Sequence, residues 1–212
     1  MISPPGHSAQ PRKADMIEFI LAMSLIELFG LVTGVLTVWL LIKQNIWTWP
    51  VGIAYIGASL YIFYTSRLYA DFALHIFFLI TSIYGWYYWI KGGERDDSAL
   101  PVSNESKRTL IGLLAVCAVA VAICGTAFSI YTDADLPYWD NTTSMLSLLA
   151  MWLQSRKKIE SWMLWLVIDV LSVGIYFYKE IYFYSLLYIV YIGMAVMGYL
   201  AWKKSYSDAH GN

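Results

Sequence analysis

Long apolar runs alternate with short polar segments along this chain. A helix rises about 1.5 Å per residue, so about 20 apolar residues cross the hydrocarbon core of a bilayer, which is roughly 30 Å thick. The runs are continuous rather than alternating with period two, which disfavours a closed β-barrel. They cover approximately residues 17–42, 48–66, 72–90, 109–131, 140–155, 161–178 and 181–202. The pattern therefore predicts an all-α integral membrane protein with seven transmembrane helices.

Polar interruptions set some of these helices apart. The second, fifth and sixth runs are short or polar, with Pro50 near the start of the second and Asp169 inside the sixth. Proline and ionisable residues are tolerated at membrane depth where neighbouring helices shield them from lipid. We expect these helices to face other helices.

Composition supports a membrane protein and narrows its partners. Hydrophobic residues make up 59% of the 212 residues and charged residues only 14%, whereas soluble domains carry about 25% charged residues. The net charge of −1 offers no basic surface. The lipid bilayer is therefore an expected partner, and nucleic acid is not.

Basic residues predict the orientation of the chain, because Lys and Arg concentrate in cytoplasmic loops. With seven spans, the two termini lie on opposite sides. Four basic residues fall on the N-terminal side: Arg12, Lys13, Arg67 and Lys179. Ten fall on the C-terminal side: Lys43, Lys91, Arg95, Lys107, Arg108, Arg156, Lys157, Lys158, Lys203 and Lys204. We therefore expect a cytoplasmic C-terminus and an N-terminus outside.

The N-terminal tail and the two cysteines add no reactive chemistry. Residues 1–15 are rich in proline and polar side chains, which is typical of a disordered tail, and the apolar stretch after them is too long for a cleavable signal peptide. Cys117 and Cys124 are seven residues apart on one helix face, so they cannot bridge to each other. We expect buried thiols, no metal site and no cofactor.

The two ends of the apolar region resemble each other. A shift of 113 positions without a gap aligns Trp, Gly and Tyr residues as well as common aliphatic ones. The matched pairs include Trp39/Trp152, Trp49/Trp162, Tyr69/Tyr182, Gly85/Gly198, Trp89/Trp202 and Lys91/Lys204. Four spans separate matched helices, so both halves run the same way through the membrane. We expect a first three-helix repeat over 16–91, a linker helix over 109–131 and a second repeat over 139–204.

One face of the sixth run carries the main candidate site residues. Trp162, Trp165 and Asp169 are spaced i, i+3 and i+7, which places them on one side of a helix. The repeat gives Asp169 an apolar counterpart, so the acid belongs to one half only. The same offset pairs His75 with Tyr188 inside the membrane. Because repeat transporters bind substrate near the midplane between their repeats, these residues are candidate ligand contacts.

Five motifs carry a more specific resemblance. They are WxWP from Trp47, LYAD from Leu68, YGWxxW from Tyr84, PxWD from Pro137 and WxxWxxxD from Trp162. Over nearly the whole chain beyond the tail, this combination resembles the nicotinamide riboside transporter family (PnuC), a bacterial relative of the SWEET sugar transporters. The resemblance implies a SWEET-like 3+1+3 arrangement and a homotrimer in the bacterial inner membrane. It also implies facilitated diffusion of the vitamin, with a cytoplasmic kinase trapping the product.

The resemblance further implies that Trp162, Trp165 and Asp169 contribute to substrate binding. Nicotinamide riboside is a flat pyridinium cation on a ribose, and a cation over an indole face gains about 0.5–2 kcal/mol. An ionised Asp169 would complement that fixed charge. The chain has His75 where many members have Gln, a departure that bears on the identity of the substrate.

Further polar side chains complete the expected binding set. Asn141, Thr143 and His75 have the donors and acceptors needed to bond the ribose hydroxyls or the carboxamide. Tyr188 belongs to the same set as the repeat counterpart of His75. Binding is expected to be modest, because a carrier must also release its substrate.

Each candidate also has a structural interpretation. Trp162 and Trp165 suit packing or an interfacial belt, as do the tryptophans near the ends of runs: Trp39, Trp47, Trp49, Trp89 and Trp202. Asp169 suits a hydrogen bond between helices, and His75 suits a packing histidine.

Three residues outside the candidate site have structural roles in this interpretation. Asp140 is expected to be the N-cap of its helix. Gly85 and Gly198 are expected to permit close helix contact.

Other functions fit parts of the same pattern. The chain has no HExxH, no GxSxG and no Cys/His group, so it is not expected to be an enzyme. Thiamine is an alternative substrate, because it too is an aromatic cation. Ion-coupled transport through Asp169 or His75, and a receptor that binds without translocating, are the remaining alternatives.

Overall fold

The computed structural model describes residues 25–91, 100–132 and 135–211. This part of the chain forms seven α-helices, so the all-α prediction is confirmed. They are α2 (Leu25–Ile42), α3 (Thr48–Thr65), α4 (Tyr69–Lys91), α5 (Lys107–Tyr131), α6 (Pro137–Ser155), α7 (Glu160–Tyr178) and α8 (Tyr182–His210). The expected tail and the start of the first apolar run lie outside the described residues.

Five of the helices are long and apolar enough to cross a membrane, judged by length and composition: α2, α4, α5, α7 and α8. The helices α3 and α6 fall outside this set, and they correspond to the second and fifth runs, which were expected to be short or polar. The sixth run, α7, qualifies although it contains Asp169.

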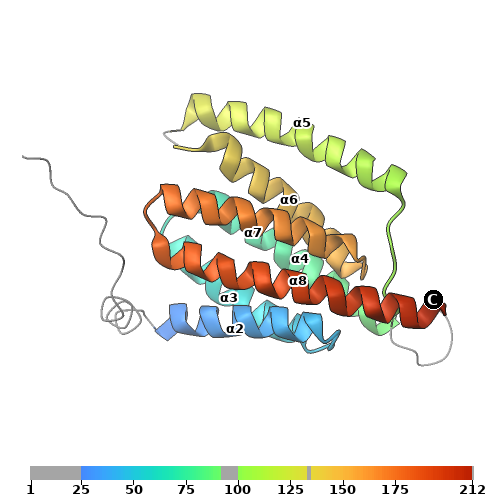
Figure 1. The fold of residues 1–212 in the computed structure, drawn as a ribbon. Helices are drawn as coiled ribbons and strands as arrows, with labels where there is room; N and C mark the ends of the chain where they lie inside the picture. The colour runs from blue at the N-terminus through green and yellow to red at the C-terminus, as the bar shows by residue number, and fades with distance from the viewer. Residues whose placement is uncertain (1–24, 92–99, 133–134, 212) are drawn as a thin grey trace, which may run out of the picture.

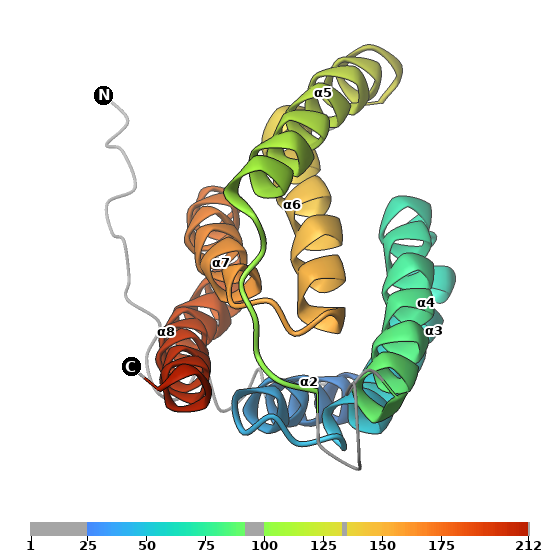
Figure 2. The same cartoon turned by 90° about the vertical axis from the view of Figure 1, so that its right-hand side faces the viewer.

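Six helices form a ring, and the seventh lies outside it (Figures 1 and 2). Around the ring, α2 contacts α3, α3 contacts α4, α4 contacts α6, α6 contacts α7, α7 contacts α8, and α8 returns to α2. The remaining helix, α5, packs on the outer side of α6. The end-on view in Figure 2 shows this order directly.

Four helix ends share one geometry and fall into two pairs at the sequence offset of 113. Gln44 (φ 54°) pairs with Lys157 (φ 58°), and Arg67 (φ 59°) pairs with Glu180 (φ 59°). Each sits in the left-handed region just after a helix, the position of a Schellman motif. The backbone N–H of the following residue donates to the carbonyl oxygen five residues before it. Examples are Asn45 N to Leu40 O and Lys158 N to Leu153 O, both 2.9 Å. The two halves therefore end their first two helices in the same way.

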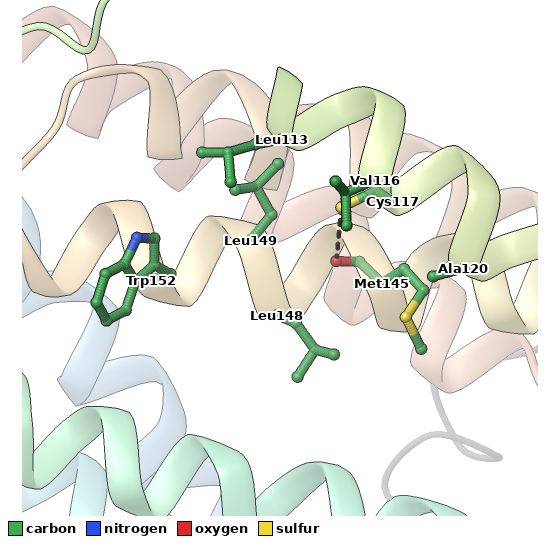
Figure 3. Close-up of a pocket in the computed structure, with 8 residues that line it drawn as sticks. All are labelled: Leu113, Val116, Cys117, Ala120, Met145, Leu148, Leu149 and Trp152. Carbon is green, nitrogen blue, oxygen red and sulfur yellow. Dashed lines mark hydrogen bonds between the residues drawn. The ribbon is translucent and has the colours of Figure 1, made fainter. Parts of the chain in front are cut away.

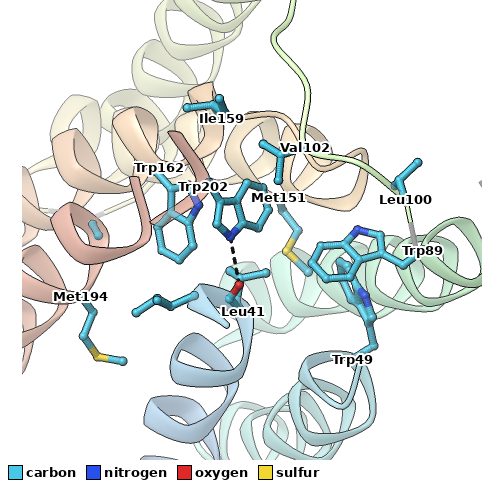
Figure 4. Close-up of a cluster of buried hydrophobic side chains, with 12 residues drawn as sticks. Leu41, Trp49, Trp89, Leu100, Val102, Met151, Ile159, Trp162, Met194 and Trp202 are labelled. Atoms are coloured by element: carbon cyan, nitrogen blue, oxygen red, sulfur yellow. Dashed lines mark hydrogen bonds between the residues drawn. The ribbon is translucent and has the colours of Figure 1, made fainter. Parts of the chain in front are cut away.

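Four buried tryptophans join the two halves into one core (Figure 4). The tryptophan cluster consists of Trp49, Trp89, Trp202 and Trp162, whose successive ring centroids lie 5.3, 6.0 and 5.5 Å apart. The end pairs Trp49–Trp89 and Trp162–Trp202 are both edge-to-face, at 87° and 88°, the arrangement that the aromatic quadrupole favours. Trp49, Trp89 and Trp202 are all buried. Trp89 and Trp202 therefore have the packing role of the two left open for them, and the interfacial role expected of Trp49 is wrong. Trp47, which is 63% exposed, keeps it.

Gly85 and Gly198 make room for this cluster. A Cβ atom at Gly85 would overlap the Trp49 indole, and one at Gly198 would overlap the Trp162 indole. The expectation that these glycines permit close contact is confirmed, and the group that approaches is an indole ring. Each glycine thus lets a tryptophan on one helix lie flat against the next.

Replacing Gly198 by Ala should lower the stability of the protein. The added methyl group would displace the buried Trp162, and overpacking of this kind costs about 1–3 kcal/mol. Gly193→Ala is the matched control on the same helix, because a Cβ there meets open space. We expect thermal unfolding in detergent to show a lower midpoint for Gly198→Ala alone. Equal midpoints for the two variants would contradict this packing role.

Candidate functional site

Asp169 is the one buried carboxylate in the described part of the chain. It projects from α7 and is only 6% exposed. Its carboxylate interacts electrostatically with Tyr188 and Tyr191, which lie on α8. Tyr55 on α3 interacts with the same two tyrosines. Because α2 separates α3 from α8 in the ring, these side chains meet across the ring interior.

Gly34 on α2 brings a fourth helix to this group. A Cβ atom at that position would lie 3.3 Å from the Tyr191 hydroxyl and 3.3 Å from the Tyr55 ring. The absence of a side chain at Gly34 therefore lets Tyr55 and Tyr191 approach each other over α2. We call Tyr55, Asp169, Tyr176, Tyr188 and Tyr191 the central polar cluster.

Three tyrosines of the central polar cluster have mostly apolar counterparts in the first half of the chain. Tyr176 stacks on Tyr188, with ring centroids 5.3 Å apart, and Tyr188 contacts Tyr191 at 6.0 Å. At the offset of 113, the counterparts of these three tyrosines are Phe63, His75 and Phe78.

The counterpart rings lie in the same order. Phe63 contacts His75 at 4.7 Å, and His75 contacts Phe78 at 5.2 Å. The second half therefore carries hydroxyls and a carboxylate where the first half carries mostly hydrocarbon. The polar chemistry of the ring interior is concentrated on α7 and α8.

His75 borders this cluster from α4. It is 8% exposed, and its ring lies 6.3 Å from that of Tyr55. Its Nδ1 lies 2.9 Å from the carbonyl oxygen of Asp71. A carbonyl only accepts, so Nδ1 carries the proton and a neutral imidazole offers Nε2 as an acceptor. His75 is thus partly a packing histidine, with one ring nitrogen left for other partners.

The two predicted tryptophans occupy different environments. Trp162 is 2% exposed within the tryptophan cluster (Figure 4), and its Nε1 has no hydrogen-bond partner among the described residues. Trp165 is half-buried, and its Nε1 donates to Gln154 Oε1 on α6 at 2.7 Å. Sequence reasoning missed Gln154, whose only signal was a polar side chain near the end of an apolar run.

Asn141 and Thr143 lie near the start of α6 and bond within that helix. The Asn141 amide donates to Pro137 O at 2.7 Å, and the Thr143 hydroxyl donates to Asp140 O at 2.9 Å. The N-cap role expected of Asp140 is wrong, because α6 begins at Pro137 and Asp140 lies in its first turn. Its carboxylate instead accepts from Lys179 Nζ at 3.0 Å.

An apolar groove lies outside the ring, between α5 and α6 (Figure 3). Its volume is about 250 Å³. Its lining is Leu113, Val116, Cys117, Ala120, Met145, Leu148, Leu149 and Trp152. None of these residues belongs to the predicted binding set, and the one bond drawn there runs from Cys117 Sγ to Met145 O at 3.7 Å. The candidate site is therefore the ring interior around Asp169.

No metal site accompanies the cluster within the described ranges: no group of three or more His, Cys, Asp or Glu is placed to hold a metal ion. Cys117 and Cys124 are both free.

Comparison with known proteins gives one family and one fold. The family model for the nicotinamide mononucleotide transporter matches residues 24–204. The nicotinamide riboside transporter PnuC of Escherichia coli is 28% identical over 207 residues, covering 86% of this chain and 87% of the relative. The riboflavin/roseoflavin transporter RibM of Streptomyces davaonensis is 25% identical over 182 residues, covering 83% of each chain.

A crystal structure of the vitamin B3 transporter PnuC shares this fold. The TM-score is 0.72 at 22% identity, over 91% of this chain and 87% of that one. The helical ring is therefore a fold already seen in a membrane transporter.

The bond between Trp165 and Gln154 should contribute to stability through coupling of the two side chains. A hydrogen bond of this kind is worth about 0.5–1.5 kcal/mol, and an indole N–H left buried without a partner costs about 1–3 kcal/mol. We expect Gln154→Leu to destabilise wild type more than it destabilises Trp165→Phe. Reversible unfolding in SDS of both single variants and the double variant measures the coupling. Additive effects would contradict the bond.

Proposed function

The chain belongs to the nicotinamide mononucleotide transporter family, whose members are membrane transporters and not enzymes, and we propose that it carries nicotinamide riboside across a bacterial inner membrane. The observation that carries this proposal is Asp169, a buried carboxylate beside Tyr188 and Tyr191 of the neighbouring helix α8. An isolated ionised group is costly to bury. A cationic substrate removes that cost when it binds.

The side chains around Asp169 fit the parts of this substrate. The half-exposed face of Trp165 can stack on the pyridinium ring, and Gln154 holds the plane of that indole. Tyr188 and the Nε2 atom of His75 supply a donor and an acceptor for the ribose hydroxyls and the carboxamide. In this proposal Trp162, buried against Gly198, positions α7 and acts on the substrate through Trp165.

Asn141 and Thr143 are proposed to meet the substrate at the end of the ring where α6 begins. Both side chains now bond to carbonyl oxygens of their own helix. Asp140 and Lys179 form an ion pair at the same end. A hydroxylated substrate entering there can exchange hydrogen bonds with Asn141 and Thr143 at little cost, because each bond is replaced by another.

The proposed architecture is a parallel 3+1+3 repeat, with halves over 16–91 and 139–204 and α5 as the linker. It is supported by the paired left-handed turns and by the tryptophan and aromatic pairs that recur at the offset of 113. All seven helices cross the membrane in this proposal, with the N-terminus outside and the C-terminus in the cytoplasm. The excess of ten basic residues over four supports that orientation.

The proposed assembly is a homotrimer, as the family resemblance implies. The outer surface of α5 is apolar and exposed, including Val116 (67%), Val119 (60%) and Ile123 (65%). A surface of this kind suits lipid chains or a neighbouring subunit in the membrane.

Removing the charge of Asp169 should weaken binding of the cation selectively. We expect Asp169→Asn to raise the Kd of nicotinamide riboside at least tenfold, as measured by calorimetry on the purified protein. Reduced nicotinamide riboside is the matched ligand, because its dihydropyridine ring is neutral, and its Kd should change little. Equal effects on both ligands would contradict the electrostatic role.

The identity of the vitamin is tested with the same wild-type protein. Thiamine and riboflavin are titrated separately beside the riboside, since one relative is named a riboflavin transporter. Tight binding of either vitamin with no response to nicotinamide riboside would identify that vitamin as the substrate instead. The fold assignment would be unchanged.

Transport is proposed to be facilitated diffusion, with phosphorylation in the cytoplasm trapping the product. In proteoliposomes without a kinase, labelled riboside should equilibrate to equal concentrations inside and outside. A protonophore or the removal of Na⁺ should not change the final level. Uptake above equilibrium that collapses with an ion gradient would instead establish an ion-coupled carrier.

A further inference from the structure

Residues 100–105 form a strap across one end of the ring. Figure 2 shows this segment running past the ends of the helices to reach α5. Two of its apolar side chains, Leu100 (7% exposed) and Val102 (3% exposed), are buried beside the tryptophan cluster (Figure 4). A connection that only joined two helices would not need to bury these side chains. The strap therefore closes this end of the core.

The strap is held by a short run of backbone bonds to the turn between α6 and α7. Ser103 N donates to Lys157 O at 3.1 Å, and Ile159 N donates to Ser103 O at 3.0 Å. Lys158 Nζ donates to Asn104 O at 3.0 Å. The net contribution of each such bond is small, because it replaces bonds that the same groups make to water. These bonds fix where the strap docks on the turn, yet they are weak enough to break when the strap opens.

Lys157 lies under the closed strap. Its hydrogen bond helps to fix the position of the strap, and its burial costs desolvation free energy. Its side chain is 3% exposed, its Nζ donates to Leu100 O at 2.6 Å, and it lies 4.6 Å from the centroid of the Trp89 ring. Burial lowers the pKa of Lys157 from 10.5 to about 8, so the ammonium form still dominates at pH 7. An ammonium has three donors, and no ion pair to Lys157 occurs in the described chain. Opening the strap would return this charge to water.

The two halves meet at two junctions, α2 with α8 and α4 with α6. The first junction has a hydrogen bond that the second lacks. Trp202 Nε1 on α8 donates to Leu41 O on α2 at 3.1 Å (Figure 4). At the offset of 113, the equivalent bond would join Trp89 on α4 to the Gln154 carbonyl on α6. Trp89 Nε1 is buried without a partner among the described residues, and its ring faces the Lys157 ammonium instead. The two junctions therefore differ in this bond.

We infer that the strap is a gate for transport, and that Trp89 is the residue that changes partner when it opens. The inference rests on the proposed transport function. With residues 100–105 on the 157–160 turn, this end of the ring is closed and Trp89 is held by Lys157 and Leu100. When the strap leaves, Trp89 donates to the Gln154 carbonyl, as Trp202 does to Leu41. That new bond offsets part of the cost of exposing Leu100 and Val102 to water.

A disulfide across the strap tests the gate. Ser103 and Lys158 are opposite each other in a short parallel β-bridge, which brings their Cβ atoms near enough for a cystine. The variant carries Ser103→Cys and Lys158→Cys, with Cys117→Ala and Cys124→Ala to remove the other thiols. We expect the oxidised protein to bind nicotinamide riboside and to take it up at least tenfold more slowly, with reduction restoring uptake. Uptake by the oxidised protein at the reduced rate would overturn the gate.

Two matched tryptophan variants test the change of partner. Trp202→Phe removes a bond that is present in this structure, so its thermal midpoint should fall. Trp89→Phe removes an N–H that has no partner here, so its midpoint should fall less while uptake drops several-fold. Wild-type uptake by Trp89→Phe would overturn the role assigned to Trp89.

Failure of the gate can be told apart from failure of the proposed function. A wild-type protein that neither binds nor transports the riboside would count against the function alone. Hydrogen exchange at the Ser103 and Ile159 amides then decides the gate without any substrate. Exchange that slows at least tenfold on oxidation supports an opening strap, and exchange unchanged by oxidation overturns it.

Discussion

The contact between an indole and a glycine, made once in each half, is the constraint on which the rest of this structure depends. Trp49 lies on Gly85 and Trp162 lies on Gly198, so α3 packs on α4 and α7 packs on α8 through a flat ring and a bare backbone. Each indole then meets a second tryptophan edge-on. Because the two pairs also contact each other, the halves are fixed relative to one another at this end, and the ring closes around its interior.

The two halves share this packing and differ in their chemistry. Their turns and ring contacts recur at one offset, so the same backbone geometry serves both. Hydroxyls and a carboxylate occupy the second half at positions where the first half has Phe63, Phe78 and Ile56. Apolar packing in one half is thus free to stabilise the ring, while the other half bears the cost of buried polar groups. This division explains why the buried carboxylate and most of the tyrosines of the candidate site are on α7 and α8.

The sequence predicted the helices, and it showed an offset of 113 at which the left-handed turns recur, because both depend on local pattern. Helix bounds follow apolar runs, and the offset follows rare residues such as Trp and Gly. It also placed Asp169 in a helix that is long and apolar enough to cross a membrane. Whether an individual tryptophan is buried in the core or lies at the membrane interface could not be predicted in this way, because an amphipathic indole suits both environments. Trp89 and Trp202 were therefore left with both roles open, and Trp49 was assigned to the wrong environment.

Two further residues show the same limit at the level of polar side chains. Asp140 looked like a helix cap, yet α6 starts at Pro137, a residue favoured in the first turn. Its carboxylate was then free to pair with Lys179, 39 residues away. The bond from Trp165 to Gln154 likewise joins neighbouring helices. Contacts of this kind depend on how helices pack, which no local pattern specifies.

Two buried ionisable side chains suggest why such a fold can move. Asp169 lies in the ring interior and Lys157 lies under the strap, both nearly inaccessible and neither in an ion pair within the described chain. Burial disfavours the charged form of each side chain. In the proposed function a bound cation favours the carboxylate form of Asp169, and in the proposed gate an open strap returns the Lys157 ammonium to water. The tryptophan–glycine contacts carry no charge and gain nothing from either event, so they can stay fixed while the site fills and the strap opens.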